Sequence, residues 1–91
     1  MSRMLFLTPE EIDELFRQDP ATAGDGGFQH FIVRLQKKVR RATQEIRLEE
    51  KDLEDIPHFA FDFKKGGWQT RLLTIFGRTL GPRLGREPDS Q

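Results

Sequence analysis

One amphipathic pattern occurs twice in the chain. Leu7–Leu15 reads LTPEEIDEL, and 41 residues later Leu48–Ile56 reads LEEKDLEDI, with each apolar position of the first stretch matched by an apolar one in the second. Further along, GGFQ at 26–29 returns as GGWQ at 66–69, an offset of 40. Short amphipathic helices resemble one another by chance, but a shared Gly-Gly-aromatic-Gln does not follow from helix formation alone. The pattern predicts two divergent copies of one unit, at residues 4–43 and 44–81.

Each unit is expected to contain a short extended stretch, an acidic helix and a second helix. Thr8 suits an N-cap, Pro9 suits the first helical position, and Glu11 completes a capping box. Phe28 begins an apolar stripe at helical spacing, and the last helix carries a wider apolar arc. We therefore predict helices at 9–18, 28–42, 50–63 and 68–80. The extended stretches Leu5–Leu7 and Ile46–Leu48 are candidates for a short two-stranded antiparallel ribbon.

These elements predict a mainly α fold, a small helical bundle of two pseudo-twofold repeats. The length of 91 residues suits a single domain over residues 1–91. Residues 81–91 contain two Pro and two Gly, so 82–91 is expected to be a flexible tail.

Four residues are expected to shape the packing. Pro57 should end or kink the third helix; a strand through the alternating Phe residues at 59, 61 and 63 is the weaker alternative. Gly77, inside the last helix, is expected to let another helix approach closely. Phe28 and Trp68 hold matching positions in the repeat and are predicted to be buried at equivalent core sites. Stacking on nucleic-acid bases is the alternative role for these two rings.

The charges are sorted along the chain although the formal net charge is zero. Residues 1–25 carry two basic and six acidic groups, and residues 45–62 carry two basic and seven acidic groups. Residues 26–44 carry five basic groups and no acid, and residues 63–91 carry six basic and two acidic groups. The sign of the charge therefore alternates with the helices of the repeat.

This alternation has two interpretations. In the first, acidic helices lie beside basic helices and weak ion pairs line the seams. In the second, the basic helix faces bind an anionic partner. The candidate residues for such a partner are Arg34, Lys37, Lys38, Arg41, Lys64, Lys65, Arg71 and Arg78. In the wide apolar arc of the last helix, Leu73 and Leu80 are candidates for an apolar interface.

The residue types argue against catalysis. The chain has no Cys and no Tyr, and its only serines are Ser2 and Ser90 near the ends. His58 and Asp62 are one helical turn apart but lack a third metal ligand. The Gly-Gly turns are not followed by the Lys-Ser or Lys-Thr of a phosphate-binding loop. We therefore expect no enzyme, no metal and no cofactor.

Hydropathy points to a soluble cytoplasmic protein. No apolar run approaches the roughly 20 residues of a membrane span, and the apolar start at Met4–Leu7 is too short for a signal peptide. No membrane partner is expected.

Five short stretches carry a resemblance. They are Asp19-Pro20, GDGGFQ at 24–29, LEDIP at 53–57, GGWQ at 66–69 and IFGRTLG at 75–81. With them the chain resembles short bacterial proteins of mobile-element or phage-like origin that have no assigned activity. The resemblance implies only that the gene belongs to a mobile element or phage-like region, and it assigns no catalytic or binding residues.

A binding function is the remaining expectation. We predict a small interaction module that binds a larger protein partner, as a mobile-element accessory or inhibitor. One alternative is a nucleic-acid-binding protein that uses the basic faces of the helices at 28–42 and 68–80; another is a structural homo-oligomer, such as a homodimer. Zero net charge favours the protein partner, because phosphate neutralisation supplies most of the affinity of nucleic-acid binders.

Overall fold

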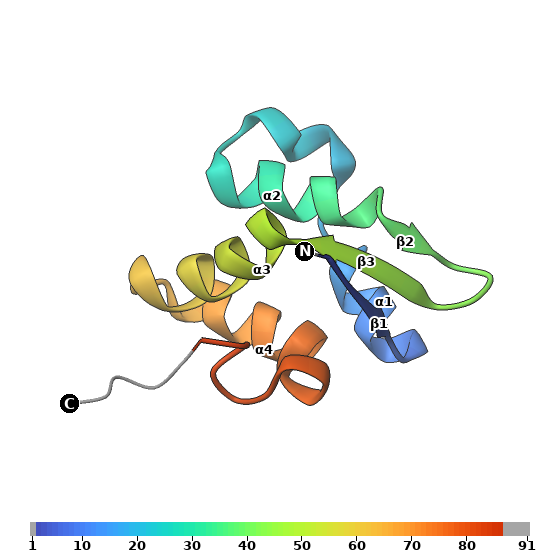
Figure 1. The fold of residues 1–91 in the computed structure, drawn as a ribbon. Coiled ribbons are helices and arrows are strands. Elements are labelled where there is room, and N and C mark those ends of the chain that lie inside the picture. The colour runs from blue at the N-terminus through green and yellow to red at the C-terminus, as the bar shows by residue number, and fades with distance from the viewer. Residues whose placement is uncertain (1, 87–91) are drawn as a thin grey trace.

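A small antiparallel sheet lies at the centre of the fold, and helices pack against one of its faces (Figure 1). The structure, a computed structural model, describes residues 2–86. In chain order the elements are β1 (Ser2–Phe6), α1 (Pro9–Leu15), a 3₁₀ helix η1 (Pro20–Gly24), α2 (Gly27–Gln36), β2 (Val39–Arg40), β3 (Glu45–Glu49), α3 (Glu50–Pro57), a π-helix η2 (His58–Asp62) and α4 (Gly66–Leu80).

The sheet has the strand order β1-β3-β2, with both pairs antiparallel. Leu5 lies opposite Ile46, and the N–H of Leu7 donates to the carbonyl of Gln44 at 2.9 Å. The mainly helical character and the predicted antiparallel ribbon are therefore confirmed. The side-chain pattern is consistent with this pairing, because Leu5 of β1 and Ile46 and Leu48 of β3 are buried while Met4, Phe6 and Arg47 between them are exposed.

The third strand corrects the prediction of a helix over 28–42. Helix α2 ends at Gln36, whose side-chain amide donates to the carbonyls of Leu15 (3.0 Å) and Gln18 (2.9 Å). The chain then turns, and the β-branched Val39 pairs with Ile46. Val39 still packs against the core, so the apolar stripe that indicated a longer helix continues into a strand.

Helix α1 begins as predicted and ends earlier. The Thr8 hydroxyl accepts from the N–H of Glu11 at 3.1 Å, and the Glu11 carboxylate accepts from the N–H of Thr8 at 2.8 Å, which completes the capping box. The helix ends at Leu15 rather than at residue 18. Asp19 precedes Pro20, which disfavours helical geometry at Asp19, and its carboxylate instead caps η1.

The segment around Pro57 remains helical. Helix α3 runs to Pro57, and the chain continues without a break as the π-helix His58–Asp62. Pro57 has no N–H to donate, which is consistent with a change in hydrogen-bonding pattern at this point. The helical prediction over 50–63 is confirmed, and the strand alternative is wrong.

The core is formed by the inner face of the sheet and the apolar sides of the helices. Phe28 is 1% exposed, whereas Trp68 is half-buried, and the two rings stack on each other at 4.5 Å between centroids and 7° between planes. They share one cluster instead of filling two separate core sites. Leu84, inside the segment 82–91 that was predicted to be a flexible tail, is fully buried in this cluster; residues 87–91 lie outside the described part. The buried apolar residues of the cluster are Leu5, Leu7, Ile12, Leu15, Phe28, Phe31, Ile32, Leu35, Ile46, Leu48, Ile56, Ala60, Leu72, Ile75, Phe76 and Leu84.

Gly77 does not mark a close helix contact. A methyl group added there would meet only the side chain of Leu73, one turn earlier in the same helix, at an ordinary 3.8 Å. The expectation of close approach at this position is therefore wrong.

Replacement of Gly77 by alanine is expected to raise the free energy of unfolding by about 0.5–1 kcal/mol, because alanine restricts the unfolded chain and favours the helix. Urea unfolding measures this change, and a destabilised variant would contradict it.

Among residues 2–86, no helix combines the length and apolar character needed to cross a membrane.

Candidate interaction site

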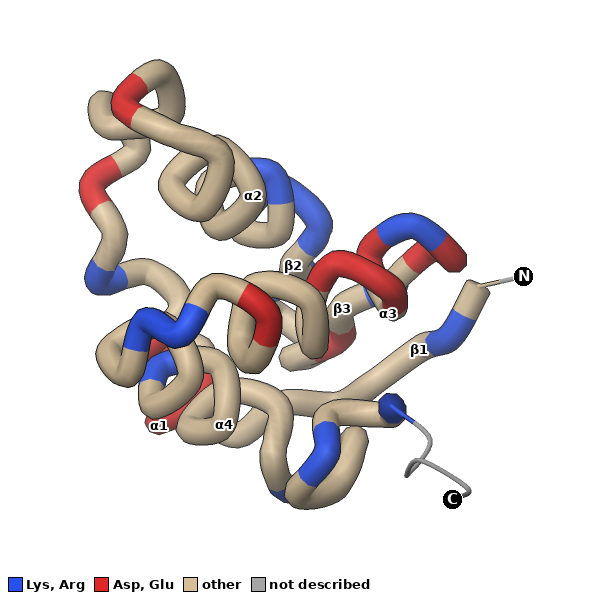
Figure 2. The backbone as a smooth tube through the Cα atoms, turned by 90° about the vertical axis from the view of Figure 1, so that its left-hand side faces the viewer, with Lys and Arg blue, Asp and Glu red and all other residues tan. Residues whose placement is uncertain are grey.

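Two of the predicted anion-binding residues, Arg34 on α2 and Lys38 just beyond its end, face α3. Arg34 Nη2 lies 2.8 Å from Asp52 Oδ1 and 3.2 Å from Asp55 Oδ2. Lys38 Nζ lies 2.8 Å from Asp52 Oδ2. Figure 2 shows the basic end of α2 beside the acidic first turn of α3. These two cations are engaged within the molecule.

Two more predicted residues, on α4, face α1 in the same way. The Arg78 guanidinium donates to both carboxylate oxygens of Glu11, at 3.0 and 3.1 Å, and to the carbonyl of Phe6. Arg71 Nε lies 3.4 Å from Glu14 Oε2, and Arg71 Nη1 donates to Gln18 Oε1 at 2.8 Å. The first interpretation of the charge pattern, seams of ion pairs between helices, thus accounts for four of the eight candidates.

The central acids of both seams are ionised groups held close to the core. Burial raises the pKa of Asp52, but hydrogen bonds from Lys38, the Glu49 N–H and Arg34 outweigh it, and its pKa is lowered. Burial likewise raises the pKa of Glu11, and hydrogen bonds from Arg78 and Thr8 bring it below its ordinary value. Each carboxylate serves two roles, because each also accepts the N–H of its own helix's N-cap residue.

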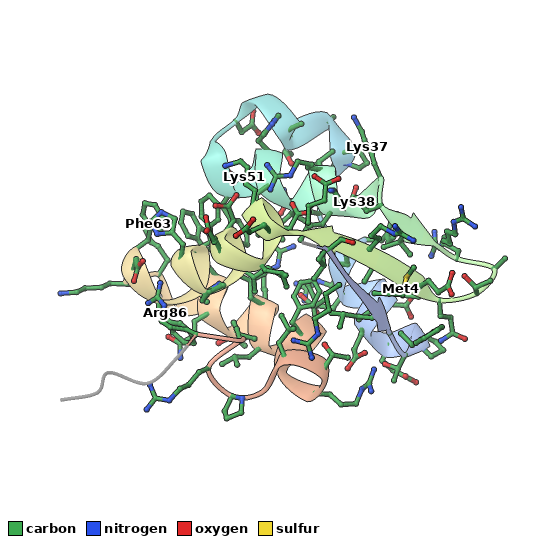
Figure 3. The ribbon with its side chains drawn as sticks, in the orientation of Figure 1. Met4, Lys37, Lys38, Lys51, Phe63 and Arg86 are labelled. Carbon is green, nitrogen blue, oxygen red and sulfur yellow. The ribbon has the colours of Figure 1, made fainter. Side chains whose placement is uncertain are left out.

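The other four candidates are not brought together by the fold. Lys37 points into solvent beyond the end of α2 (Figure 3). The Arg41 guanidinium lies over the Phe16 ring, 4.4 Å from its centroid. Lys64 and Lys65 are exposed in the turn before α4. The eight candidates are therefore divided between the two seams and separate exposed positions.

The two residues predicted to form an apolar interface on α4 do not form an exposed apolar patch. Leu73 and Leu80 are both half-buried and pack against the core. The wide apolar arc of α4 is explained by its place between α1 and the π-helix, which it contacts on two sides. Among residues 2–86, the exposed large apolar side chains are Met4, Phe6 and Phe63.

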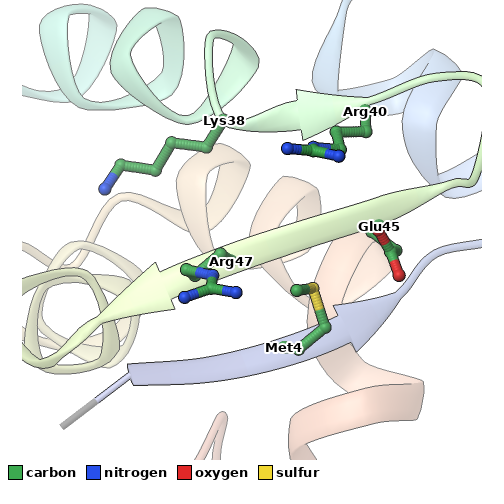
Figure 4. Close-up of a pocket in the computed structure, with 5 residues that line it drawn as sticks. All are labelled: Met4, Lys38, Arg40, Glu45 and Arg47. Carbon is green, nitrogen blue, oxygen red and sulfur yellow. The ribbon is translucent and has the colours of Figure 1, made fainter.

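The outer face of the sheet gathers side chains that the sequence prediction did not select. Met4 is 40% exposed and Phe6 is 59% exposed, both on β1. Arg47 of β3 lies opposite Met4, and Arg40 of β2 lies opposite Glu45. A pocket of about 250 Å³ opens on this face (Figure 4). Its lining residues are Met4, Lys38, Arg40, Glu45 and Arg47.

The electrostatics of this pocket differ from those of the seams. No ion pair within residues 2–86 involves Arg40 or Arg47, although Glu45 lies on the same face. The Glu45 carboxylate accepts a hydrogen bond from the Thr43 hydroxyl at 3.1 Å. Two guanidinium groups thus remain available beside two exposed apolar side chains, an arrangement that can hold a carboxylate and an apolar group together.

This face was not predicted from the sequence, because Arg40 falls in the helix predicted over 28–42 and only a short two-stranded ribbon was expected. A signal was present in the period-2 alternation of both main strands. Leu5 and Leu7 alternate with Met4 and Phe6, and Ile46 and Leu48 alternate with Glu45, Arg47 and Glu49. That pattern predicts a sheet with one buried and one open face.

Potential metal ligands do not gather in the described residues. Within residues 2–86, no group of three or more His, Asp or Glu side chains is placed to hold a metal ion. His58 Nδ1 lies 2.8 Å from Asp62 Oδ2, and Arg86 donates to both oxygens of the same carboxylate. Hydrogen bonds from Arg86 and His58 hold the pKa of Asp62 well below its ordinary range.

Comparisons of the chain with protein-family models, curated proteins and solved structures found no match.

Proposed function

We propose that this protein is a small interaction module that binds an acidic protein partner through the outer face of its sheet. The observation that carries the proposal is the pocket on that face, where Arg40 and Arg47 have no carboxylate within ion-pair distance. The exposed Met4 and Phe6 beside it supply apolar contact. Aromatic residues, Met and Arg are the types enriched at protein interfaces.

The distribution of the remaining charge supports an acidic protein rather than a duplex. The cations expected to line a nucleic-acid surface at 34, 38, 71 and 78 are engaged with Asp52, Asp55, Glu11 and Glu14. Two arginines on a narrow face are too few for the many phosphate contacts of a duplex binder, but they suit one or two carboxylates. The proposed partner therefore presents an apolar group flanked by Asp or Glu.

The test uses a partner recovered by the tagged protein from nuclease-treated lysate of its host, purified and then titrated against variants. The double variant Arg40→Gln with Arg47→Gln should weaken binding by about tenfold or more, because Arg at an interface centre contributes strongly. Phe6→Ala should weaken it by several-fold for loss of apolar contact. Isothermal titration calorimetry provides the affinities.

A matched control removes two positive charges at positions outside the sheet. Lys51→Gln with Arg83→Gln changes exposed residues outside the sheet, and it should bind as the unmodified protein does. Equal weakening by both double variants would show a general charge effect and contradict the proposed surface. A concentration-dependent dimer lost on Phe6→Ala, with no partner retained, would assign the face to a second copy of this chain instead.

We also propose that the two halves arose by duplication. The support lies in the seams: Asp52 follows Glu11 by 41 positions, and Arg78 follows Lys38 by 40. The pairs Lys38–Asp52 and Arg78–Glu11 thus occupy corresponding positions of the proposed repeat, although Lys38 lies two residues beyond the end of α2 and Arg78 lies within α4. The proposal predicts that the two units, residues 4–43 and 44–81, associate through these seams when they are expressed as separate chains. Independent folding of one unit as a monomer would contradict this prediction.

A further inference from the structure

A ladder of stacked rings runs from the core to the surface at the end of the molecule away from Met4 (Figure 3). Phe31, 1% exposed, stacks on Phe59 at 5.0 Å between centroids and 20° between planes. Phe59 in turn stacks on Phe63 at 5.4 Å and 15°. Phe63 is the last ring of the ladder and is 44% exposed.

The end of the ladder is held in place by edge contacts. Trp68 and His58 both meet Phe63 at interplanar angles of 67°, with centroids 5.5 and 4.9 Å away. Within residues 2–86, Phe59 is the only ring stacked in parallel on Phe63. The π-helix that carries Phe59 sets this arrangement, and π-helical segments occur frequently at functional sites.

The charge around this ring is positive. Lys64 and Lys65 follow Phe63 directly, are exposed, and make no ion pair within the described residues. The nearest acid in the sequence, Asp62, is already bound by Arg86 and His58. Among residues 58–86 the chain has no other Asp or Glu.

We propose that Phe63, with Lys64 and Lys65, forms a second binding site that takes single-stranded nucleic acid. A base stacks in parallel on Phe63 as the next member of the ladder, and the lysines contact the adjoining phosphates. Each base has a π-face that aromatic residues recognise, and lysines supply the electrostatic attraction to the strand. An acidic peptide would satisfy the lysines but leave the stacking position unused, and in a duplex the base faces are covered by neighbouring bases. The site is separate from the sheet face of the proposed function.

Trp68 gives the test an intrinsic reporter, because it is the only Trp and its ring lies 5.5 Å from Phe63. Titration with oligothymidylate of about ten nucleotides, a length within the usual site size, should quench Trp68 fluorescence. Phe63→Leu should weaken binding about tenfold through loss of stacking. Lys64→Gln with Lys65→Gln should weaken binding and reduce the slope of log affinity against log salt by about 1.4, at roughly 0.7 for each phosphate contact.

Three controls distinguish base stacking on Phe63 from a general attraction between charges. Lys37→Gln removes an exposed lysine elsewhere and should leave both affinity and slope unchanged. Thermal unfolding of Phe63→Leu, whose ring is half-exposed, checks that the fold is retained. Unchanged binding by folded Phe63→Leu overturns the proposal. Equal quenching by another ligand at the same concentration of molecules would also overturn the proposal. Polyglutamate would assign the surface to polyanions in general, a DNA duplex would assign it to duplexes, and thymidine monophosphate would assign it to free nucleotides.

Discussion

Replacement of Asp52 by alanine is expected to lower the free energy of unfolding by about 3 kcal/mol. Asp52 is only 2% exposed and binds Arg34 and Lys38 at 2.8 Å each. Its Oδ2 also accepts the N–H of Glu49, the N-cap residue of α3, at 2.9 Å. The substitution therefore removes a helix cap and leaves two partly buried cations without their main partner. Asp52→Asn keeps an acceptor for the cap and should cost less, about 1–2 kcal/mol.

Urea unfolding as a function of pH separates the ionic part of this effect. The pKa of Asp52 is lowered in the folded state relative to the ordinary 3.8, so its contribution is fully present above that value. The contribution is lost as the pH falls through the lower folded value. The stability difference between the unmodified protein and Asp52→Asn should thus be constant above about pH 5 and shrink below about pH 3.

Glu54→Ala is the matched control for Asp52, because it removes an exposed acid from the same helix. Its effect should stay within about 0.5 kcal/mol. A difference between the unmodified protein and Asp52→Asn that does not change between neutral and acidic pH would contradict an ionic role for Asp52.

Replacement of Phe28 by alanine is expected to cost about 4 kcal/mol. Phe28 is buried, stacks on Trp68, meets the edge of Phe59 at 6.0 Å, and lies beneath Arg71, whose guanidinium carbon is 5.4 Å from the ring centroid. The cavity would therefore open under the ring cluster and beside the seam between α4 and α1. Denaturant unfolding gives the free energy, and a red shift of Trp68 emission in the folded variant reports the lost stack.

Two comparisons test the reason for this effect. Phe28→Leu fills part of the cavity and should cost less, about 1–2 kcal/mol. Phe6→Ala removes the same side chain from an exposed position and should stay within about 0.5 kcal/mol. A cost for Phe28→Ala no larger than that for Phe6→Ala would contradict the central place of the ring cluster in the core.

The sequence predicted the local elements because their signals are local. The capping box of Thr8 and Glu11 depends on residues three positions apart, and it is present in the structure. The end of α4 at Leu80 and the helical path through Pro57 follow from apolar spacing, which operates over one or two turns. The pairing of the β1 and β3 stretches was also within reach, because both alternate with period 2 and precede an acidic helix.

The sequence could not decide which charges pair within the fold and which remain available. Arg34 and Lys38 were as suitable for an external anion as Lys37, and only the position of α3 engages them with Asp52. Val39 and Arg40 matched a helical pattern as well as a strand, and the strand forms because Ile46 and Glu45 pair with them across the turn. Phe63 is the last residue of the helix predicted over 50–63, and its position at the exposed end of the ring ladder depends on Phe31, which another helix contributes.

The sequence thus predicted the four main helical segments, the Thr8–Glu11 capping box, the strand alternation and the sorting of charge along the chain, because each depends on neighbouring residues. It did not predict the 3₁₀ helix η1 or the π-helical form of η2. Tertiary structure alone decided where α2 ends, which acids and bases meet in the seams, and which face of the sheet stays open. These outcomes depend on contacts between residues 7 to 67 positions apart, as in the Val39–Ile46 pairing and the Arg78–Glu11 contact. Packing decides which side chains meet over such separations. Packing can therefore place a cation beside a carboxylate or leave that cation in water, whatever residues flank the cation in the sequence.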